Sequence, residues 1–175
     1  MLYGCLPLLR GWMYQYVDKS GTLNLGEEKV LDRLEAPGWI LDMFGRVDGS
    51  KDAKYARFRI EIDGPDRAYP IVFSAYDLKL ASLTVPVNHG VFLTCYDDAE
   101  KVYVGALSPS QPVPFCRRVE VKIIAPTAPI EETTALPINY RVAYTLAKII
   151  DEKAFRRSLL ELLWPTRVLE KGGFG

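Results

Sequence analysis

The sequence predicts a mainly β protein in which two antiparallel sheets pack face to face as a sandwich. Short apolar runs alternate with polar residues, most regularly in "RFRIEI" at residues 57–62, where Phe58, Ile60 and Ile62 alternate with charged side chains. The 12 prolines and 13 glycines separate these runs, which favours many short elements over a few long ones. The spacing of the runs is typical of a two-sheet sandwich, with a barrel as the alternative.

We expect about eight short strands between residues 23 and 146, which form the sandwich domain. Residues 27–36 fit a short helix or an edge strand equally well. In "INYRVAYTL", at residues 138–146, Tyr140 and Tyr144 share one face with Val142 and Leu146. The connections between strands are long and contain prolines, which favours a jelly-roll-like winding. The clearer strands are expected at residues 38–47, 55–63, 69–73, 91–96, 101–107, 116–125 and 138–146.

The two ends of the chain have a different character from this domain. Residues 1–22 are rich in aromatic side chains, and we expect an N-terminal arm that packs on its own domain or docks on a neighbouring subunit. Residues 147–175 are expected to form a C-terminal α-helix, the only convincing helix in the sequence, followed by a flexible tail. This helix packs on its own sheet or on a neighbour. The candidate interface residues are Tyr3, Trp12, Tyr14, Tyr16, Leu160, Leu163 and Trp164.

The charge balance restricts the partners that the protein can have. Lys and Arg number 22, and Asp and Glu also number 22, so the formal net charge is zero. This argues against nucleic-acid binding through phosphate neutralisation and fits a subunit that associates with copies of itself. The N-terminal apolar run is broken by Pro7 and Arg10 and lacks a basic region, so we expect no secretion signal. No run is apolar enough for a membrane span.

The sequence contains no recognisable catalytic motif, and we expect a non-enzymatic protein without cofactor or metal. GxSxG, HExxH and P-loop patterns are absent, and the three cysteines form no CxxC pair. A small enzyme that uses Asp63, His89 or Asp97 is a weaker reading. The Asp-bearing turns at residues 48–52 and 63–66 fit side-chain hydrogen bonds to the backbone, with an ion site as the alternative.

The ten tyrosines and three tryptophans suggest a second function, a carbohydrate-binding or receptor-binding module. Exposed coplanar aromatic rings on a sheet or loop can stack on sugar rings. The candidates for this role are Tyr55, Tyr69, Tyr76 and Tyr103.

Three segments carry a family likeness: "LEAPGWILDMFGRV", "RFRIEIDG" and "VYVGALSPSQPVPFCRRVEVKIIAP". Their strand and turn signatures resemble those of jelly-roll-like β-sandwich structural proteins of tailed phages and related viruses, over roughly residues 30–146. The resemblance implies a structural subunit of a virus particle, such as a head decoration, neck or tail component. Such a subunit is assembled in the host cytoplasm, resides in the virion, and binds itself and other particle subunits through its terminal extensions and sheet edges. The resemblance gives no catalytic residues to carry over.

Overall fold

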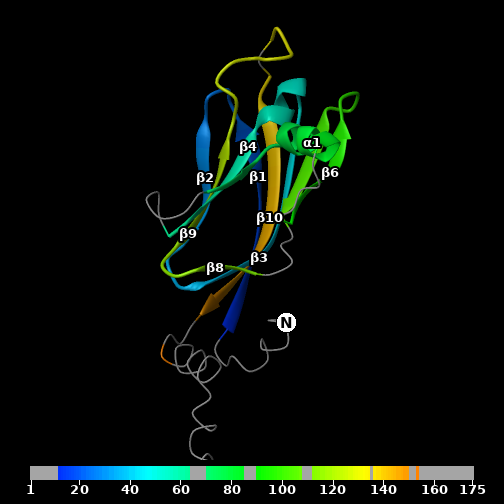
Figure 1. Cartoon of the computed structure of the whole chain (residues 1–175). Helices are drawn as coiled ribbons and strands as arrows, with labels where there is room; N and C mark the ends of the chain where they lie inside the picture. The colour runs from blue at the N-terminus through cyan, green and yellow to red at the C-terminus, as the bar shows by residue number, and fades with distance from the viewer. Residues whose placement is uncertain are drawn as a thin grey trace, which may run out of the picture.

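The computed structural model describes residues 12–63, 70–84, 90–107, 112–134, 136–149 and 153, which form a mainly β protein with two antiparallel sheets (Figure 1). The first sheet has the strand order β1-β10-β3-β7-β6, with β8 also paired to β3, and the second has the order β2-β9-β4-β5. The strands of the first sheet are β1 (Trp12–Leu23), β10 (Ile138–Ile149), β3 (Gly38–Asp48), β7 (Val102–Leu107), β6 (Val91–Asp97) and β8 (Val113–Phe115). Those of the second are β2 (Glu28–Leu34), β9 (Val119–Ile124), β4 (Arg57–Ile62) and β5 (Ile71–Phe73).

The strands pair in a nested order, from the two ends of the sequence towards its middle. β1 pairs with β10, β2 with β9, β3 with β7 and β8, and β4 with β5. Successive strands from β1 to β4 lie alternately in the first and second sheets, so the chain crosses between the sheets at each connection. β7 and β8 occupy one position beside β3, because Met43 lies opposite Leu107 and Ile40 lies opposite Val113.

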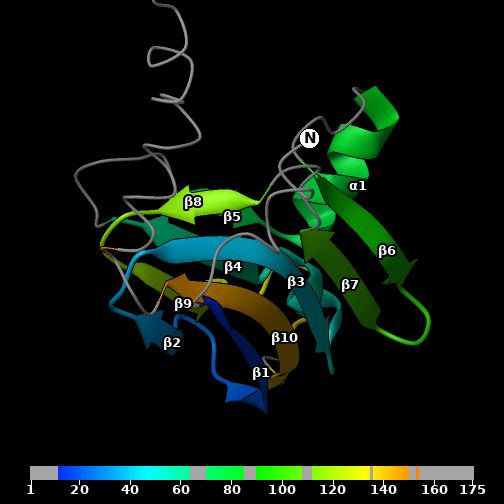
Figure 2. The same ribbon diagram turned by 90° about the horizontal axis from the view of Figure 1, so that it is seen from below.

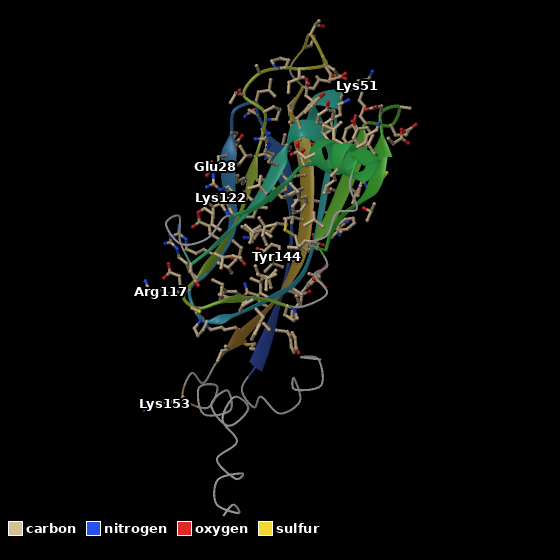
Figure 3. The ribbon with its side chains drawn as sticks, viewed as in Figure 1. Glu28, Lys51, Arg117, Lys122, Tyr144 and Lys153 are labelled. Carbon is tan, nitrogen blue, oxygen red and sulfur yellow. The ribbon has the colours of Figure 1, made fainter. Side chains whose placement is uncertain are left out.

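The core lies between the two sheets and follows the alternation of each strand. In β10 the inward residues Tyr140, Val142, Tyr144 and Leu146 are all buried, as their pattern in the sequence predicted. Figure 3 shows Tyr144 inside the sandwich. β4 and β9 contribute Phe58, Ile60, Val119, Val121 and Ile123 from the second sheet, and all join one hydrophobic cluster with the residues of the first. Burial of these side chains is the main force that holds the sheets together.

Gly45 of β3 faces the ring of Phe58 of β4 across the core. A Cβ atom on Gly45 would lie 2.4 Å from the Phe58 ring, closer than any carbon contact allows. Glycine is therefore required here by the neighbouring ring, and the ring fills the space that a side chain would occupy.

The predicted N-terminal arm, residues 1–22, overlaps the first strand of the structure. Residues 12–22 belong to β1, which pairs with β10 over its whole length, from Trp12 opposite Ile149 to Leu23 opposite Ile138. They are part of the sheet because every second residue from Gln15 to Leu23 faces the interior side, where Val17 packs against the core. Tyr3 and the rest of the predicted arm, residues 1–11, lie outside the described residues.

At the other end, β10 continues to Ile149, past residue 146, where the sandwich domain was predicted to end. Ala147 lies between Tyr14 of β1 and Trp39 of β3, so β10 is still a paired central strand at this point. Lys153 is helical. The rest of the predicted C-terminal helix and tail, with Leu160, Leu163 and Trp164, lies outside the described residues.

One helix was missed by the sequence analysis, and one ambiguity is resolved. Helix α1 (Ala75–Thr84) follows β5 and packs on β6, beside the short 3-10 helix η2 (Lys51–Tyr55). Figure 2 shows α1 next to β6 and β7, on the side of the molecule opposite to β1 and β2. Residues 28–34, within the stretch that fitted a helix or an edge strand, form the edge strand β2.

Candidate interaction surface

The outer face of the first sheet exposes aromatic side chains. Tyr16 of β1 is 67% exposed and Phe44 of β3 is 41% exposed, and Tyr14 lies further along β1. The strand register places Asp18 opposite Ala143 of β10, and Ala143 opposite Phe44. Asp18 and Phe44 therefore flank the small Ala143 side chain, and Tyr16, which lies opposite Thr145, stands at a diagonal position on the same face.

This arrangement creates a shallow hollow of about 500 Å³. We call it the Tyr16–Phe44 face, lined by Tyr16, Asp18, Phe44, Arg46, Val104, Arg141 and Ala143. Exposed aromatic rings around a small floor residue are typical of protein–protein contacts, where a partner side chain can fill the hollow.

Charges of both signs surround the hollow. The Arg141 guanidinium lies 2.8 Å from an Asp18 carboxylate oxygen, and Arg46 Nε lies 2.9 Å from Asp48 Oδ2. The hydrogen bond from Arg141 lowers the pKa of Asp18, so this carboxylate stays ionised near neutral pH. A face that carries both signs in equal number suits a partner with the same surface.

The outer face of the second sheet is different, because an ion-pair ladder covers its centre. Lys122 of β9 contacts Glu28 at 3.1 Å, Glu61 at 3.3 Å and Glu120 at 3.0 Å. Glu120 also pairs with Arg33 of β2. Figure 3 shows Glu28 and Lys122 together on this side of the molecule. These charges satisfy one another within the chain, which makes the first sheet the better candidate for contact with a partner.

Of the interface residues predicted from the sequence, Tyr14 and Tyr16 lie exposed on the Tyr16–Phe44 side of β1, and Trp12 is the first residue of that strand. The sequence analysis missed Phe44 and Ala143. The alternation of β3 and β10 could have placed each on the face opposite the core, but only the pairing of the strands brings them beside Tyr16.

A second group of polar residues ties three segments together at one end of the sandwich. The Lys54 ammonium of η2 lies 3.1 Å from Asp98 Oδ1, in the turn after β6, and 3.3 Å from Glu131 Oε1, in the β9–β10 connection. Tyr103 donates a hydrogen bond of 2.9 Å to the same Asp98 oxygen. Asp52 accepts the backbone N–H groups of residues 130 and 131. We call Lys54, Asp98, Tyr103 and Glu131 the Lys54 cluster.

The electrostatics of the Lys54 cluster indicate a structural role. Burial alone would lower the pKa of Lys54, but hydrogen bonds to Asp98 and Glu131 outweigh it and raise the pKa above its ordinary value. The hydrogen bond from Tyr103, with a further contribution from Lys54, lowers the pKa of Asp98. A lysine that acts as a base needs a lowered pKa, so the cluster serves to bind the three segments.

Two of the three residues proposed for catalysis, Asp63 and Asp97, bind backbone N–H groups in the structure. Burial alone would raise the pKa of Asp63. The backbone N–H groups of residues 116–118 donate to its carboxylate and lower the pKa below its ordinary value. Asp97 accepts the backbone N–H groups of the next turn, at Ala99 and Glu100. Asp97 thus binds the backbone of its own turn, as is common for Asp in turns, whereas Asp63 binds the backbone of a segment distant in the sequence. His89 lies outside the described residues.

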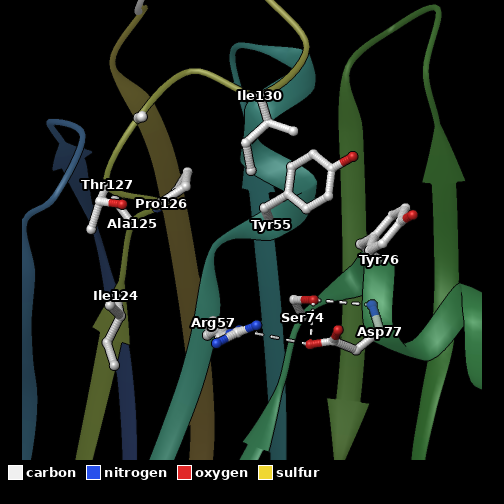
Figure 4. A pocket seen from close by; sticks show the side chains of 11 residues that line it. Tyr55, Arg57, Ser74, Tyr76, Asp77, Ile124, Ala125, Pro126, Thr127 and Ile130 are labelled. Atoms are coloured by element: carbon white, nitrogen blue, oxygen red, sulfur yellow. Dashed lines mark hydrogen bonds and ion pairs between the residues drawn. The ribbon is translucent and has the colours of Figure 1, made fainter.

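A pocket of about 430 Å³ lies at one end of the second sheet, between the end of β9, the start of β4 and helix α1 (Figure 4). Tyr55 and Tyr76 line it with ring centroids 4.6 Å apart and a tilt of 47°. Of the four tyrosines proposed for sugar stacking, these two therefore share a pocket, although their rings are not coplanar. Tyr103 is fully buried. Tyr69 lies outside the described residues.

Comparison with known proteins yields no relative: no protein-family model matches the chain, and no curated protein matches its sequence. Within the described part of the chain, no three His, Cys, Asp or Glu side chains gather closely enough to hold a metal ion. Across the same residues, no helix combines the length and apolar character needed to cross a membrane.

Proposed function

We propose that the protein is a non-enzymatic structural subunit of a virus or phage particle, which associates with a second copy of itself through the Tyr16–Phe44 face. In this role it is a head decoration, neck or tail component, assembled in the host cytoplasm and resident in the virion. The observation that carries the proposal is the exposed aromatic face of the first sheet, where Tyr16 is 67% exposed beside Phe44.

The nested strand pairing supports the resemblance to jelly-roll particle proteins. In a jelly roll, one long folded hairpin of paired strands is rolled into two sheets. The orders β1-β10-β3-β7 and β2-β9-β4-β5 correspond to such a winding, with β6 as an additional edge strand. Because folds serve many functions, this likeness supports the particle role only together with the exposed face.

The charges of the Tyr16–Phe44 face favour a second copy as the partner. The face holds Arg46, Arg141 and Asp18, with Asp48 paired to Arg46 beside it, and the whole chain has a formal net charge of zero. A two-fold contact places the same surface on both partners, so a surface with both signs can pair with itself without net repulsion. The aromatic rings supply the apolar area that such a contact buries.

The test is the solution mass of the purified full chain, measured by light scattering, with Phe44→Glu and Tyr16→Arg as variants. We expect the wild type to form an oligomer and both variants to fall to the monomer mass of 19.7 kDa, because a charge enters the centre of the contact. Val72→Glu is the matched control, since Val72 is similarly exposed on the second sheet and should leave the oligomer intact. A monomeric wild type, or oligomers that persist in both variants, would contradict the proposal.

A terminal truncation tests the contribution of the predicted arm to assembly. Deletion of residues 1–22 would remove β1 and expose the edge of β10, so its effect on mass would not isolate the arm. Deletion of residues 1–11 leaves β1 complete. We expect this shorter deletion to weaken the oligomer while the circular dichroism of the fold is retained.

A further inference from the structure

The pocket between Tyr55 and Tyr76 has the features of a ligand site and is separate from the Tyr16–Phe44 face. Its volume of about 430 Å³ lies within the range of small-molecule sites, roughly 300–1,000 Å³. One wall is aromatic, and the facing wall consists of small apolar side chains from the β9–β10 connection, among them Ala125, Pro126 and Ile130. Figure 4 shows the two tyrosines between Ile130 above and the polar group Arg57, Ser74 and Asp77 below.

The polar group offers both a donor and an acceptor. Arg57 Nε lies 3.9 Å from Asp77 Oδ2, too far for a hydrogen bond, and the two side chains are 60% and 49% exposed. Asp77 is fixed in place because Ser74 donates to its carboxylate at 2.8 Å and accepts its backbone N–H at 3.0 Å. A ligand hydroxyl can therefore accept from Arg57 and donate to Asp77 without displacing a tight ion pair.

The charge of the pocket selects the class of ligand. Arg57 and Asp77 are the charged residues of its lining, one of each sign. Burial raises the pKa of Tyr55 to about 12, and the Tyr55 hydroxyl donates to Glu131 at 2.9 Å, so this phenol stays neutral and held in place. An anionic or cationic ligand would find no net opposite charge, whereas a neutral polyol would find one donor and one acceptor beside aromatic rings.

The backbone around the apolar wall argues against an extended peptide. The Ala125 N–H donates to the Glu27 carbonyl at 2.9 Å, and the Pro126 carbonyl accepts from the Gly26 N–H at 2.7 Å. A peptide that adds as a strand uses free N–H and C=O groups, and here these groups are already paired.

We propose that this pocket binds a neutral carbohydrate. A sugar ring presents an apolar face of C–H groups, which packs on the Tyr76 ring, and a rim of hydroxyl groups, which bridge Arg57 and Asp77. The pocket gives the protein a glycan-binding function in addition to any role in assembly, and the inference does not rest on the assembly proposal.

The test is binding of the purified full chain to a printed array of neutral and anionic glycans, followed by calorimetric titration with the strongest neutral ligand. Tyr76→Ala removes the stacking surface and Arg57→Gln removes the charged donor, and we expect each to weaken binding about tenfold. Tyr76→Phe keeps the ring and should bind within about threefold of the wild type. Arg117→Gln is the matched control, because Arg117 is exposed at the far end of the molecule (Figure 3) and should leave binding unchanged.

The array and its variants decide whether the pocket binds a neutral carbohydrate. The site would be established if the wild type and Arg117→Gln bind neutral glycans on the array while Tyr76→Ala and Arg57→Gln lose this binding. If Tyr76→Ala fails to fold by circular dichroism, the exposed Arg57→Gln variant gives the answer alone. The proposal would be overturned if the protein bound no neutral glycan on the array, or bound anionic glycans only. Binding that is unchanged in Arg57→Gln would overturn it as well.

Discussion

Lys54 shows how a single residue can connect distant parts of the chain. Its side chain is only 6% exposed, yet its ammonium reaches Asp98 and Glu131 and lies 5.8 Å from the centroid of the Tyr96 ring. A buried ammonium is costly unless it is paired, and here two carboxylates and an aromatic ring compensate it. The sequence did not indicate this role, since lysine is ordinarily a surface residue and its partners lie 44 and 77 positions away in the chain.

Lys54→Met should destabilise the protein by about 2 kcal/mol, because the apolar stem is kept while both charged contacts are lost. The free energy of unfolding, measured by urea denaturation, tests this expectation. Lys51→Met, on the same short helix, is the control and should cost much less. An equal loss in both variants would contradict the role assigned to the Lys54 cluster.

The pH dependence of this variant has a definite sign. The pKa values of Asp98 and Glu131 are lowered in the folded protein, so their contribution is present above the ordinary values of 3.8 and 4.5 and is lost as the pH falls through the folded values. The largest cause of the lowered pKa is the hydrogen bond from Tyr103 for Asp98 and the one from Tyr55 for Glu131, and Lys54 lowers both pKa values further. The decline in unfolding free energy from pH 5 to pH 3 should therefore be shallower in Lys54→Met than in the wild type.

At the scale of elements, the strands were predictable and helix α1 was not. The alternation that identified residues 57–62 and 138–146 as strands is the same alternation that the core uses. Helix α1 has no comparable apolar stripe, because its apolar residues lie on both faces: Leu78 is buried, whereas Leu80 is 46% exposed. Its start depends instead on Ser74, whose side chain both donates to and accepts from Asp77.

Ser74→Ala should cost about 1–2 kcal/mol, because it removes the cap from α1. Ser50→Ala provides a matched control, since Ser50 precedes η2, is equally buried, and its hydroxyl has no hydrogen-bond partner among the described residues. That substitution should be neutral or slightly stabilising. Urea denaturation of the two variants compares them directly, and equal costs would show that the Ser74 contacts do not stabilise the helix.

At the scale of the whole molecule, the packing of one sheet on the other depends on Gly45 and Phe58. Gly45→Ala should destabilise the protein by about 1–3 kcal/mol, because the new Cβ would lie 2.4 Å from the Phe58 ring. Phe58→Leu in the same chain should recover part of this loss, which makes the two effects non-additive. Thermal denaturation of the single and double variants measures the coupling. Additive losses would show that the ring and the glycine do not meet as described.

The sequence by itself determined the mainly β class and the faces shared by residues of individual strands, such as Tyr140 and Tyr144 in β10. It could do so because a period of two fixes which side chains share a face of one strand. It left the choice between sandwich and barrel open, and it did not indicate that β1 begins at Trp12 or that β10 continues to Ile149.

Only the tertiary structure decided that β1 is an integral strand, that Tyr16, Phe44 and Ala143 line one hollow, and that Tyr55 and Tyr76 share a pocket with Arg57. These groupings join residues from different strands and helices, and residues 16 and 143 are far apart in the chain. The alternation of a strand carries no information about which strand lies next to it. That choice is made by the burial of apolar surface between whole elements, which exists only once the chain has folded.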